Sequence, residues 1–431
     1  MRYVIVGNGV AGTEAALLLR RRDARAEITI VSSEHDHLFS RPALMYVLCG
    51  QLRLQDTEPF HRRLYQRLRI RLVRGRVAKL TAAERQLELE GGLRLPYDKL
   101  LLATGSLARV PDWPGLTGLQ VHSFVTLDDC QALAREARPG QRAVVVGGGL
   151  IGVEVAEVLR MLGLAVAFLV RESWYFPVAL NAEEGTLVAE RIRAHGCDLR
   201  LGVTVTELMR TAEGRLTTVR TNRGEFPSDL VVCAIGVTPN TSFLRNSDLA
   251  LAPGGGIEVD SALRTNLGDV WAAGDCANVT WADGSRRPEQ LWYTARDQGR
   301  VAARSMLGDA ACYSRSEIYN SAKFFDVEYT MAGFVPALKD AGGGPAVEPP
   351  GVTTWFRRQG DRPASQRILV RDGRVIGFSM LGSRFDHALL LRWIAEQREL
   401  SWVLARLRAA QFDEELEPVV PEAAVSVAQG A

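Results

Sequence analysis

Three glycines and one acidic residue near the start of the chain have the types and the spacing of a nucleotide-binding site. A short apolar run at 3–6 leads into the sequence GNGVAG at 7–12, and helix-forming residues follow at 15–19. Between a strand and a helix, the first glycine allows a tight turn, the second lets backbone approach a pyrophosphate, and the third allows close helix–strand packing. The free N–H groups at the start of the helix favour the phosphate charge. An acid about 20 residues further on is expected to bind a ribose hydroxyl. The candidate residues of this first site are Gly7, Gly9, Val10, Ala11, Gly12 and Glu34.

The same pattern returns about 140 residues later. An apolar run at 141–146 precedes GGGLIGVE at 147–154, a helical stretch follows, and 164–170 has the composition of the next strand. A repeated fingerprint is far more specific than either copy alone, so the sequence predicts that one chain binds two dinucleotides. The candidate residues of this second site are Gly147, Gly149, Leu150, Ile151, Gly152, Glu154 and Arg171.

Length and composition narrow the class of protein. A chain of 431 residues is too long for one ordinary core, and 47% hydrophobic with 24% charged residues is typical of a globular protein. A net charge of +2 argues against nucleic-acid binding. The sequence shows no apolar run of membrane-spanning length and no signal peptide, so we expect no membrane span and a cytoplasmic location.

The cysteines and histidines do not suggest a metal site. Six cysteines are scattered without a CxxC pair or metal-ligand spacing. His35 and His37 flank Asp36, but no partner group is evident in the sequence. We therefore expect structural or surface histidines and no bound metal.

Several further segments are expected to position the two sites. The strand-like run 97–106 ends in small residues, which suggests backbone pressed against a ligand or a crossing strand. A helix is predicted at 43–49 behind Pro42, and a long helix at 289–306. A basic helix at 58–71 is either a docking face for an acidic protein or, as base rates favour, a solvated helix face.

The last part of the chain changes character. Strand-like runs separated by turns are followed by a helical pattern at 389–408, and the tail from about 417 is expected to be disordered. The strand-like runs lie at 323–331, 352–357, 367–371 and 374–380.

These motifs, in this order, resemble those of the pyridine nucleotide-disulfide oxidoreductases, the two-dinucleotide-binding flavoproteins related to glutathione reductase. The resemblance covers roughly residues 1 to 308 and includes LLATGS at 101–106, AIGVTPN at 234–240 and AAGDCA at 272–277. It implies that the first fingerprint binds FAD and the second NADH or NADPH. It also implies that Glu154 points towards the nicotinamide, although support of the helix N-terminus is an alternative role. The further cofactor-binding candidates are Arg41, Pro42, Val77, Ala103, Thr104, Gly105, Gly236, Gly274, Asp275, Gln290, Leu291 and Trp292.

Within that resemblance, Gly274 and Asp275 would close on the FAD ribityl and phosphate, and 289–292 would lie beside the flavin ring. Trp292 is either a flavin-stacking residue or part of the core. The stretch 321–326 resembles the start of the family's C-terminal interface domain, which suggests a homodimer.

The expected fold class is α/β, with two Rossmann-like dinucleotide-binding domains and a C-terminal α+β domain. An FAD domain is interrupted by an NAD(P) domain in this arrangement. The expected boundaries are 1–118 and 243–308 for the FAD domain, 119–242 for the NAD(P) domain, 309–416 for the C-terminal domain and 417–431 for the tail.

The departures from the family pattern suggest the activity. Disulfide reductases of the family carry a CxxxxC pair after the ribose acid, and coenzyme A disulfide reductases and NADH oxidases carry a single cysteine there. In this chain FSRP at 39–42 puts Arg41 at the place of that cysteine, and Cys49 lies eight residues further on. The Arg-Pro pair resembles the cysteine-less ferredoxin and rubredoxin reductases and the flavin domain of nitrite reductase.

The resemblance therefore implies an FAD-dependent NAD(P)H oxidoreductase that needs no catalytic protein residue. Hydride would pass from NAD(P)H to FAD, and electrons then to a small acidic iron–sulfur protein, a ferredoxin or rubredoxin. Two alternatives stay open: an NAD(P)H oxidase or disulfide reductase that uses Cys49, and a non-catalytic sensor or assembly flavoprotein.

The choice of nicotinamide is ambiguous. Arg171 follows the strand 164–170, where an NAD enzyme usually has an acid, and it suits the phosphate of NADP. Glu172 and the third glycine, Gly152, point towards NAD, and Arg171 is equally explained as a merely exposed residue. On balance the sequence favours NADPH slightly.

Overall fold

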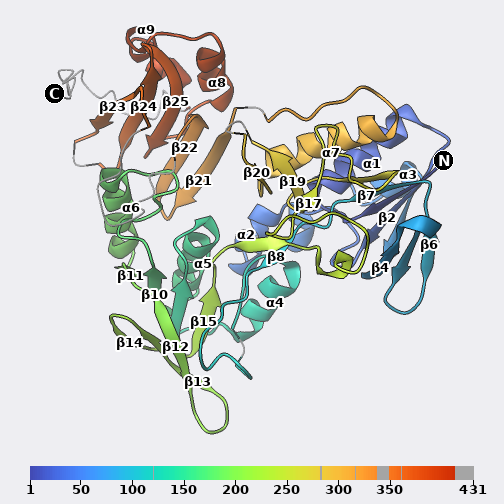
Figure 1. Cartoon of the computed structure of the whole chain (residues 1–431). Coiled ribbons are helices and arrows are strands. Elements are labelled where there is room, and N and C mark those ends of the chain that lie inside the picture. Colours follow the sequence, from blue (N-terminus) through green and yellow to red (C-terminus); the bar gives the residue numbers. More distant parts are fainter. Residues whose placement is uncertain (120, 282–283, 316, 337–348, 361, 413–431) are drawn as a thin grey trace. The chain divides into compact units, whose positions relative to one another are not determined.

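The computed structural model describes residues 1–119, 121–281, 284–315, 317–336, 349–360 and 362–412 (Figure 1). These residues form two compact units. The first unit holds 1–109, 125–134 and 236–315, and the second holds the described residues of 110–124, 135–235 and 316–431. Among the described residues, no helix has the length and apolarity needed to cross a membrane.

The core of the first unit is a parallel five-stranded sheet in the order β18-β7-β1-β2-β3. Its central strand β1 (Arg2–Val6) reads RYVIV, and four of its five residues are buried. Such apolar runs are typical of parallel strands covered on both faces. The other strands are β18 (Val270–Ala272), β7 (Lys99–Leu102), β2 (Glu27–Ser32) and β3 (Ile70–Arg74).

Two helices of the first unit pack closely against each other. They are α1 (Val10–Arg22) and α7 (Trp292–Met306) (Figure 1). The close approach depends on Gly299, where an added Cβ would lie 2.2 Å from the carbonyl oxygen of Ala11. The start of α1 is thereby held against the middle of α7.

Smaller sheets and turns surround this core. One three-stranded sheet consists of β4 (Val77–Thr81), β5 (Gln86–Leu89) and β6 (Arg94–Pro96), and another of β17 (Ile257–Glu258), β19 (Ala277–Thr280) and β20 (Arg286–Arg287). A two-stranded sheet pairs β8 (Ser106–Ala108) with β16 (Val237–Pro239). The shorter helices and helical turns are η1 (Arg41–Ala43), α2 (Leu44–Leu48), η2 (Leu54–Thr57), α3 (Leu64–Arg67), η3 (Ala82–Glu84), α4 (Leu127–Glu136) and η4 (Ser242–Leu244).

Two helix predictions in this unit have different outcomes. The helix predicted at 43–49 is present as α2, and Gly50 follows it with a left-handed φ of 76°. The long basic helix predicted at 58–71 is wrong, because only α3 is helical there. Pro59 precedes it, and Arg69 with φ 51° ends the turn before β3.

The second unit contains another parallel sheet, of four strands in the order β11-β10-β9-β15. The strands are β11 (Asp198–Leu201), β10 (Ala165–Val170), β9 (Arg142–Val146) and β15 (Leu230–Cys233). The helices α5 (Leu150–Met161) and α6 (Ala182–Ala194) accompany it. An antiparallel sheet of β12 (Val205–Arg210), β13 (Leu216–Thr221) and β14 (Gly224–Pro227) follows in the chain.

The second unit also includes an antiparallel sheet of five strands in the order β21-β22-β25-β24-β23. Strands are present at all four predicted runs, but the run 323–331 is divided between β21 and β22 by a turn in which Phe325 has φ 58°. The strands are β21 (Tyr319–Phe324), β22 (Val327–Gly333), β25 (Arg374–Leu381), β24 (Ser365–Arg371) and β23 (Val352–Arg358). The helical pattern at 389–408 is divided between α8 (His387–Ala395), α9 (Leu400–Leu404) and the turn η5 (Leu407–Ala410). Gln397 separates the two helices with φ 52°. The predicted disordered tail, 417–431, lies outside the described residues.

A buried ion pair joins α6 to the antiparallel sheet within this unit. The guanidinium of Arg367 on β24 lies 3.0 Å from the carboxylate of Glu184, and both side chains are almost fully buried. Ser379 on β25 donates to the same carboxylate at 3.0 Å. The predicted fold class, two Rossmann-like parts and a C-terminal α+β part, is confirmed.

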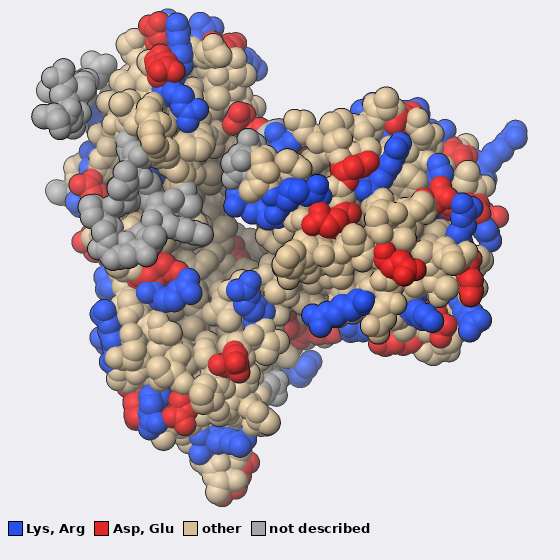
Figure 2. Space-filling model, in the orientation of Figure 1, with Lys and Arg blue, Asp and Glu red and all other residues tan. Residues whose placement is uncertain are grey.

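Charged side chains are mixed on the surface. On the face in Figure 2, basic and acidic side chains are interspersed, and neither sign covers a large continuous area. This distribution agrees with the near-zero net charge and lacks the basic stripe typical of nucleic-acid binding on that face.

Candidate functional site

The first glycine motif forms a tight turn at the end of β1. Gly7 has φ +114°, and a Cβ there would lie 2.0 Å from the carbonyl oxygen of Ala103. A Cβ on Gly12 would lie 2.1 Å from the carbonyl oxygen of Gly7. A side chain at Gly7 or Gly12 would clash with backbone atoms, so the fold itself requires glycine at both positions.

Gly9 is different, because a Cβ at this position would meet no atom within 4 Å. Gly9 is the N-cap of α1, and no side chain caps the helix there. By contrast, Asp386 caps α8 by accepting from the N–H groups of Ala388 and Leu389. The space in front of the helix N-terminus is therefore open, and the first turn of α1, which begins with Val10 and Ala11, can present its backbone N–H groups to an anion.

Glu34 and Arg41, predicted separately, form a close pair. Arg41 donates two hydrogen bonds to the Glu34 carboxylate, at 2.9 and 2.7 Å, and a third to the carbonyl oxygen of Val125 at 2.6 Å. The N–H of Leu127 donates to Glu34 at 2.8 Å. Burial raises the pKa of Glu34, but the Arg41 guanidinium and the Leu127 amide outweigh it and hold the pKa below its usual range. Pro42 follows Arg41 in the short turn η1.

Gly274 and Asp275 lie at the end of β18, beside the start of α1. A Cβ on Gly274 would lie 3.2 Å from the Cβ of Ala11. The carboxylate of Asp275 accepts a hydrogen bond from Ser106 at 2.7 Å. Burial raises the pKa of Asp275, although Ser106 and the charge of Arg41 act in the opposite direction. The first unit therefore brings both acidic candidates within the electrostatic influence of one arginine.

The other candidates of this unit lie in several loops and strands. Thr104 and Gly105 follow Ala103 after β7, and Gly105 has φ +71°. Val77 is buried at the start of β4. Gly236 accepts from the N–H of Arg109 and has φ +111°.

The segment predicted to lie beside a flavin leads into α7. Gln290 is exposed, Leu291 is the N-cap, and Trp292 is the first helical residue and half-buried. Half-burial fits both readings of Trp292, so the flavin-stacking role stays a prediction.

The second glycine motif repeats the geometry of the first. Gly147 has φ +117° and its Cβ would lie 2.3 Å from the carbonyl oxygen of Ala234, while that of Gly152 would lie 1.9 Å from the oxygen of Gly147. Gly149 has open space and is the N-cap of α5, without a side-chain cap. Leu150 and Ile151 form the first turn.

Glu154 lies one turn into α5 in an environment that disfavours its charge. Burial, followed by the charge of Glu157, raises the pKa of Glu154 to about 7. Perturbed acids of this kind are typical of functional sites.

Arg171 follows β10 with a side chain that is 78% exposed, and its guanidinium lies 3.1 Å from the carboxylate of Glu172. Its side chain is therefore accessible to a ligand.

The geometry of both motifs fits a dinucleotide. In each, two glycines are demanded by backbone contacts, while the middle glycine faces open space at an uncapped helix N-terminus. A phosphate would find unpaired N–H groups and no obstructing side chain there. Glu34, the acid that the sequence predicts as the ribose ligand of the first motif, is held by Arg41 and the Leu127 amide.

All six cysteines are free thiols. Cys276 follows Asp275, but it is fully buried, and burial raises its pKa. Burial likewise raises the pKa of Cys130 to about 11. Cys49 ends α2 half-buried, with its Sγ 3.5 Å from the carbonyl oxygen of Tyr46. The structure thus contains no disulfide among the six cysteines, all of which lie in the described part of the chain.

Sequence reasoning missed residues that support the first motif. Asn8 donates to the carbonyl oxygen of Asp36 at 3.0 Å and accepts from Tyr65 at 2.9 Å. Gln298 on α7 accepts from the N–H of Gly274 at 2.8 Å. Asn8 was visible as the polar residue between two glycines, whereas Tyr65 and Gln298 carry no local signal.

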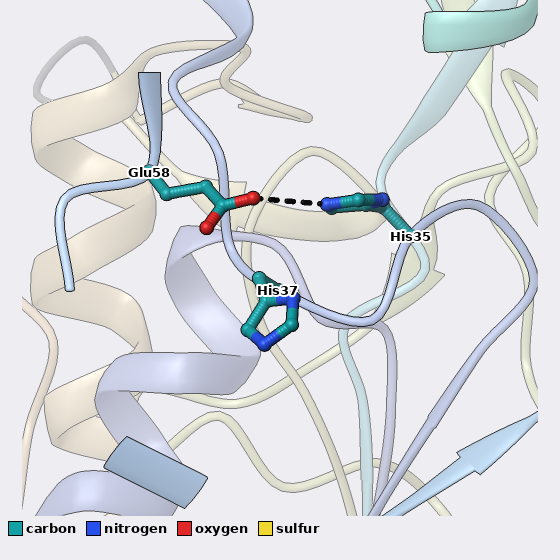
Figure 3. Close-up of side chains that lie close together, drawn as sticks. All are labelled: His35, His37 and Glu58. Carbon is teal, nitrogen blue, oxygen red and sulfur yellow. Dashed lines mark hydrogen bonds and ion pairs between the residues drawn. The ribbon is translucent and has the colours of Figure 1, made fainter. Parts of the chain in front are cut away.

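The structure adds a neighbour to the two histidines. The sequence shows no partner group for His35 and His37, and the structure places Glu58 beside them (Figure 3). The three candidate ligand atoms lie within 4.8 Å of one another. Sequence spacing alone did not reveal the partner, because Glu58 is 23 residues from His35.

Comparison with known proteins gives consistent matches. The family model described as "Pyridine nucleotide-disulphide oxidoreductase" matches residues 1–299. The 5,5'-dehydrodivanillate O-demethylase ferredoxin reductase subunit of Sphingobium sp. (strain NBRC 103272 / SYK-6) is 34% identical over 316 residues, covering 72% of this chain and 76% of that protein. The NADH-dependent phenylglyoxylate dehydrogenase subunit epsilon of Aromatoleum evansii is 28% identical over 415 residues, covering 95% and 94%.

A solved structure agrees in fold over most of the chain. The ferredoxin reductase for the CYP199A2 system from Rhodopseudomonas palustris matches with a TM-score of 0.78 and 25% identity, covering 88% of this chain and 91% of that one.

Proposed function

Since the chain belongs to the pyridine nucleotide-disulphide oxidoreductase family, we propose that it is an FAD-dependent NAD(P)H oxidoreductase that delivers electrons to a small iron–sulfur protein. The first glycine motif would hold FAD, and the second would hold the nicotinamide dinucleotide. When bound, the cofactors supply the hydride and electron transfer. The protein supplies position and electrostatics.

The role of each residue follows from its contacts. The first turn of α1 would bind the FAD pyrophosphate, and Glu34, fixed by Arg41 and the Leu127 amide, would accept from the ribose hydroxyls. The first turn of α5 would bind the nicotinamide dinucleotide in the same way.

One observation carries the proposed acceptor class. The family position for a redox cysteine holds Arg41, and its guanidinium is engaged by Glu34 and by the carbonyl oxygen of Val125. Without a thiol there, electrons would leave to an external acceptor. The printed name of the Sphingobium relative, a ferredoxin reductase subunit, supports an iron–sulfur protein of the ferredoxin or rubredoxin class.

For the nicotinamide, we propose that Arg171 sets the preference between NADPH and NADH. Its exposed guanidinium suits the 2′-phosphate of NADPH, and the neighbouring Glu172 suits free ribose hydroxyls. The Aromatoleum relative is named as NADH-dependent.

Anaerobic stopped-flow reduction of the purified flavoprotein tests the proposal. NADH and NADPH are compared in wild type, in Arg171→Glu and in Arg200→Glu, a control with another exposed arginine of the same unit. Rapid bleaching of the flavin is expected in all three, with a shift of the NADPH/NADH ratio by about tenfold or more only in Arg171→Glu. If neither nucleotide bleaches the flavin within seconds, the chain is a binding flavoprotein and not a reductase.

A second experiment tests the acceptor. Turnover with an added ferredoxin or rubredoxin is measured in wild type and Cys49→Ser. Equal turnover is expected, whereas a loss in the variant would favour the thiol-based alternative. If the acceptor protein is acidic, kcat/KM should fall as the salt concentration is raised, because salt screens the attraction between the two proteins.

A cytoplasmic homodimer remains part of this proposal, and sedimentation of the holoenzyme tests the dimer.

A further inference from the structure

Two histidines and one carboxylate of the first unit lie close together. His35 and His37 come from the loop after β2, and Glu58 comes from the segment after η2 (Figure 3). The Nε2 of His35 lies 3.3 Å from Oε1 of Glu58, and all three ligand atoms lie within 4.8 Å of one another. In Figure 3 the carboxylate faces the ring of His35, whereas the ring of His37 lies to one side of this contact and is turned away from it.

These separations are close to those of a metal site. Ligand atoms about 2.1 Å from a tetrahedral ion are about 3.4 Å apart. The distance from His35 to Glu58 is already close to this value. The widest separation, at most 4.8 Å, would have to close by up to about 1.4 Å through rotation of the His37 side chain. Two imidazole nitrogens and one carboxylate oxygen are a donor set that suits Zn²⁺ and related divalent transition metals.

The backbone that carries the two histidines is held in place by side chains around it. Ser32 donates to the carbonyl oxygen of His35, Asn8 to that of Asp36, and the N–H of Leu38 donates to Tyr65, all at 3.0 to 3.1 Å. The carbonyl oxygen of Thr57, next to Glu58, accepts from the N–H of Ser40 at 2.8 Å. These contacts fix the backbone segments from which the three side chains extend.

The carboxylate itself is oriented before any ion binds. Glu58 is only 3% exposed in its side chain, and Arg62 donates to both of its oxygens at 2.8 Å. His35 is 22% exposed, so the centre is shielded yet open to solvent on one side. An ion would replace the contact between His35 and Glu58, while Arg62 keeps its bond to Oε2.

We propose that His35, His37 and Glu58 form a binding site for one divalent transition-metal ion of the zinc type, with water completing its coordination. The proposal does not rest on the proposed electron transfer, because none of the three ligands belongs to the glycine motifs. It shares support with the first motif through Asn8, which accepts from Thr13 and Tyr65 and donates to Asp36. A bound ion would therefore stiffen the loop that presents Glu34.

Metal binding to the chelator-treated holoprotein tests the site directly. Zn²⁺ content after equilibrium dialysis and the visible absorption bands of added Co²⁺ are measured in wild type, His37→Ala and His61→Ala. His61 is an exposed histidine three residues after Glu58, and it serves as the matched control. We expect one ion per chain in wild type and His61→Ala, and an affinity at least 100-fold weaker in His37→Ala.

The outcome remains decisive if a variant folds poorly. Thermal unfolding of wild type alone should shift upward with added Zn²⁺, because the ion binds only the folded protein. Absence of stoichiometric Zn²⁺ and of Co²⁺ bands in wild type would overturn the site. An equal loss of binding in His61→Ala and His37→Ala would also overturn it. The flavin spectrum, recorded in parallel, separates loss of metal from loss of FAD.

Discussion

Arg41 and Glu34 form a paired contact in which two guanidinium N–H groups reach the two carboxylate oxygens, at 2.9 and 2.7 Å. The pair lies at the end of β2, next to the first glycine motif. It fixes the acid proposed to bind the FAD ribose, so its loss should affect cofactor retention before it affects the fold.

Replacement of Arg41 by Ala should weaken flavin binding. Hydrogen bonds to charged groups contribute about 1.5–3 kcal/mol each, so we expect the flavin Kd to rise by about 10- to 100-fold. Flavin fluorescence on titration of the apoprotein measures this change. The control is Arg53→Ala, which removes an exposed pair with Asp56 and should leave the Kd unchanged. Unchanged flavin affinity in Arg41→Ala would show that Glu34 does not depend on this contact.

The glycines of the first motif should separate folding from cofactor binding. Gly9→Ala places a Cβ in open space, so the protein should fold normally but lose flavin, because the methyl group occupies the path of the pyrophosphate. Flavin content and circular dichroism measure the two effects. Gly149→Ala should act likewise on the second site, raising the KM for NAD(P)H while the flavin is retained.

Gly12→Ala is the matched contrast, because its Cβ would lie 2.1 Å from a backbone oxygen. We expect a loss of about 3 kcal/mol in the free energy of unfolding, or failure to fold. If Gly9→Ala and Gly12→Ala lost the same free energy of unfolding and the same flavin content, the assignment of Gly9 to cofactor binding and Gly12 to folding would be wrong.

Glu154 should make stability depend on pH. Burial and Glu157 raise its pKa from 4.5 to about 7 in the folded chain. Between pH 4.5 and about pH 7, Glu154 loses its proton in the unfolded chain but keeps it in the folded chain. Rising pH therefore lowers the free energy of unfolding, and this loss is complete above about pH 7. Glu154→Gln should therefore match wild type near pH 4.5 and be more stable at pH 8.5 by up to about 3 kcal/mol.

Thermal unfolding of the nucleotide-free protein at the two pH values measures the effect. Glu190→Gln, which changes an exposed glutamate on α6, should show the same difference from wild type at both. A Glu154→Gln variant that gains no stability at high pH would contradict the raised pKa.

The buried pair between Arg367 and Glu184 should be important for stability. Arg367→Met leaves the carboxylate of Glu184 buried with Ser379 as a neutral partner, and we expect a loss of about 3–5 kcal/mol in the free energy of unfolding. Denaturant unfolding provides the measurement.

An exposed pair of the same unit provides the comparison. Arg200→Met breaks the contact with Asp198, both about half exposed, and should cost less than about 1 kcal/mol. The double variant Glu184→Gln with Arg367→Met should recover part of the loss, since it leaves no unpaired buried charge. Lack of recovery would show that packing, not charge, is lost.

The two dinucleotide motifs and the strands around them were predictable from the sequence because their determinants are local. Gly7, Gly9 and Gly12 act within one turn, and the apolar run before them reflects burial in a parallel sheet. The second motif, at 147–152, has the same local determinants. The order of further motifs was sufficient to identify the family.

The contacts between distant segments required the three-dimensional structure. Glu58 reaches His35 from 23 residues away, Arg367 reaches Glu184 from 183 residues away, and neither partner carries a local signal. The extent of the helix predicted at 58–71 also failed: only Leu64–Arg67 is helical, and Arg69 adopts a left-handed conformation before β3. The raised pKa of Glu154 depends on its burial in the folded chain, which the sequence does not show. Backbone turns are specified by adjacent residues, whereas ion pairs, burial and pKa shifts are properties of groups that only folding brings together.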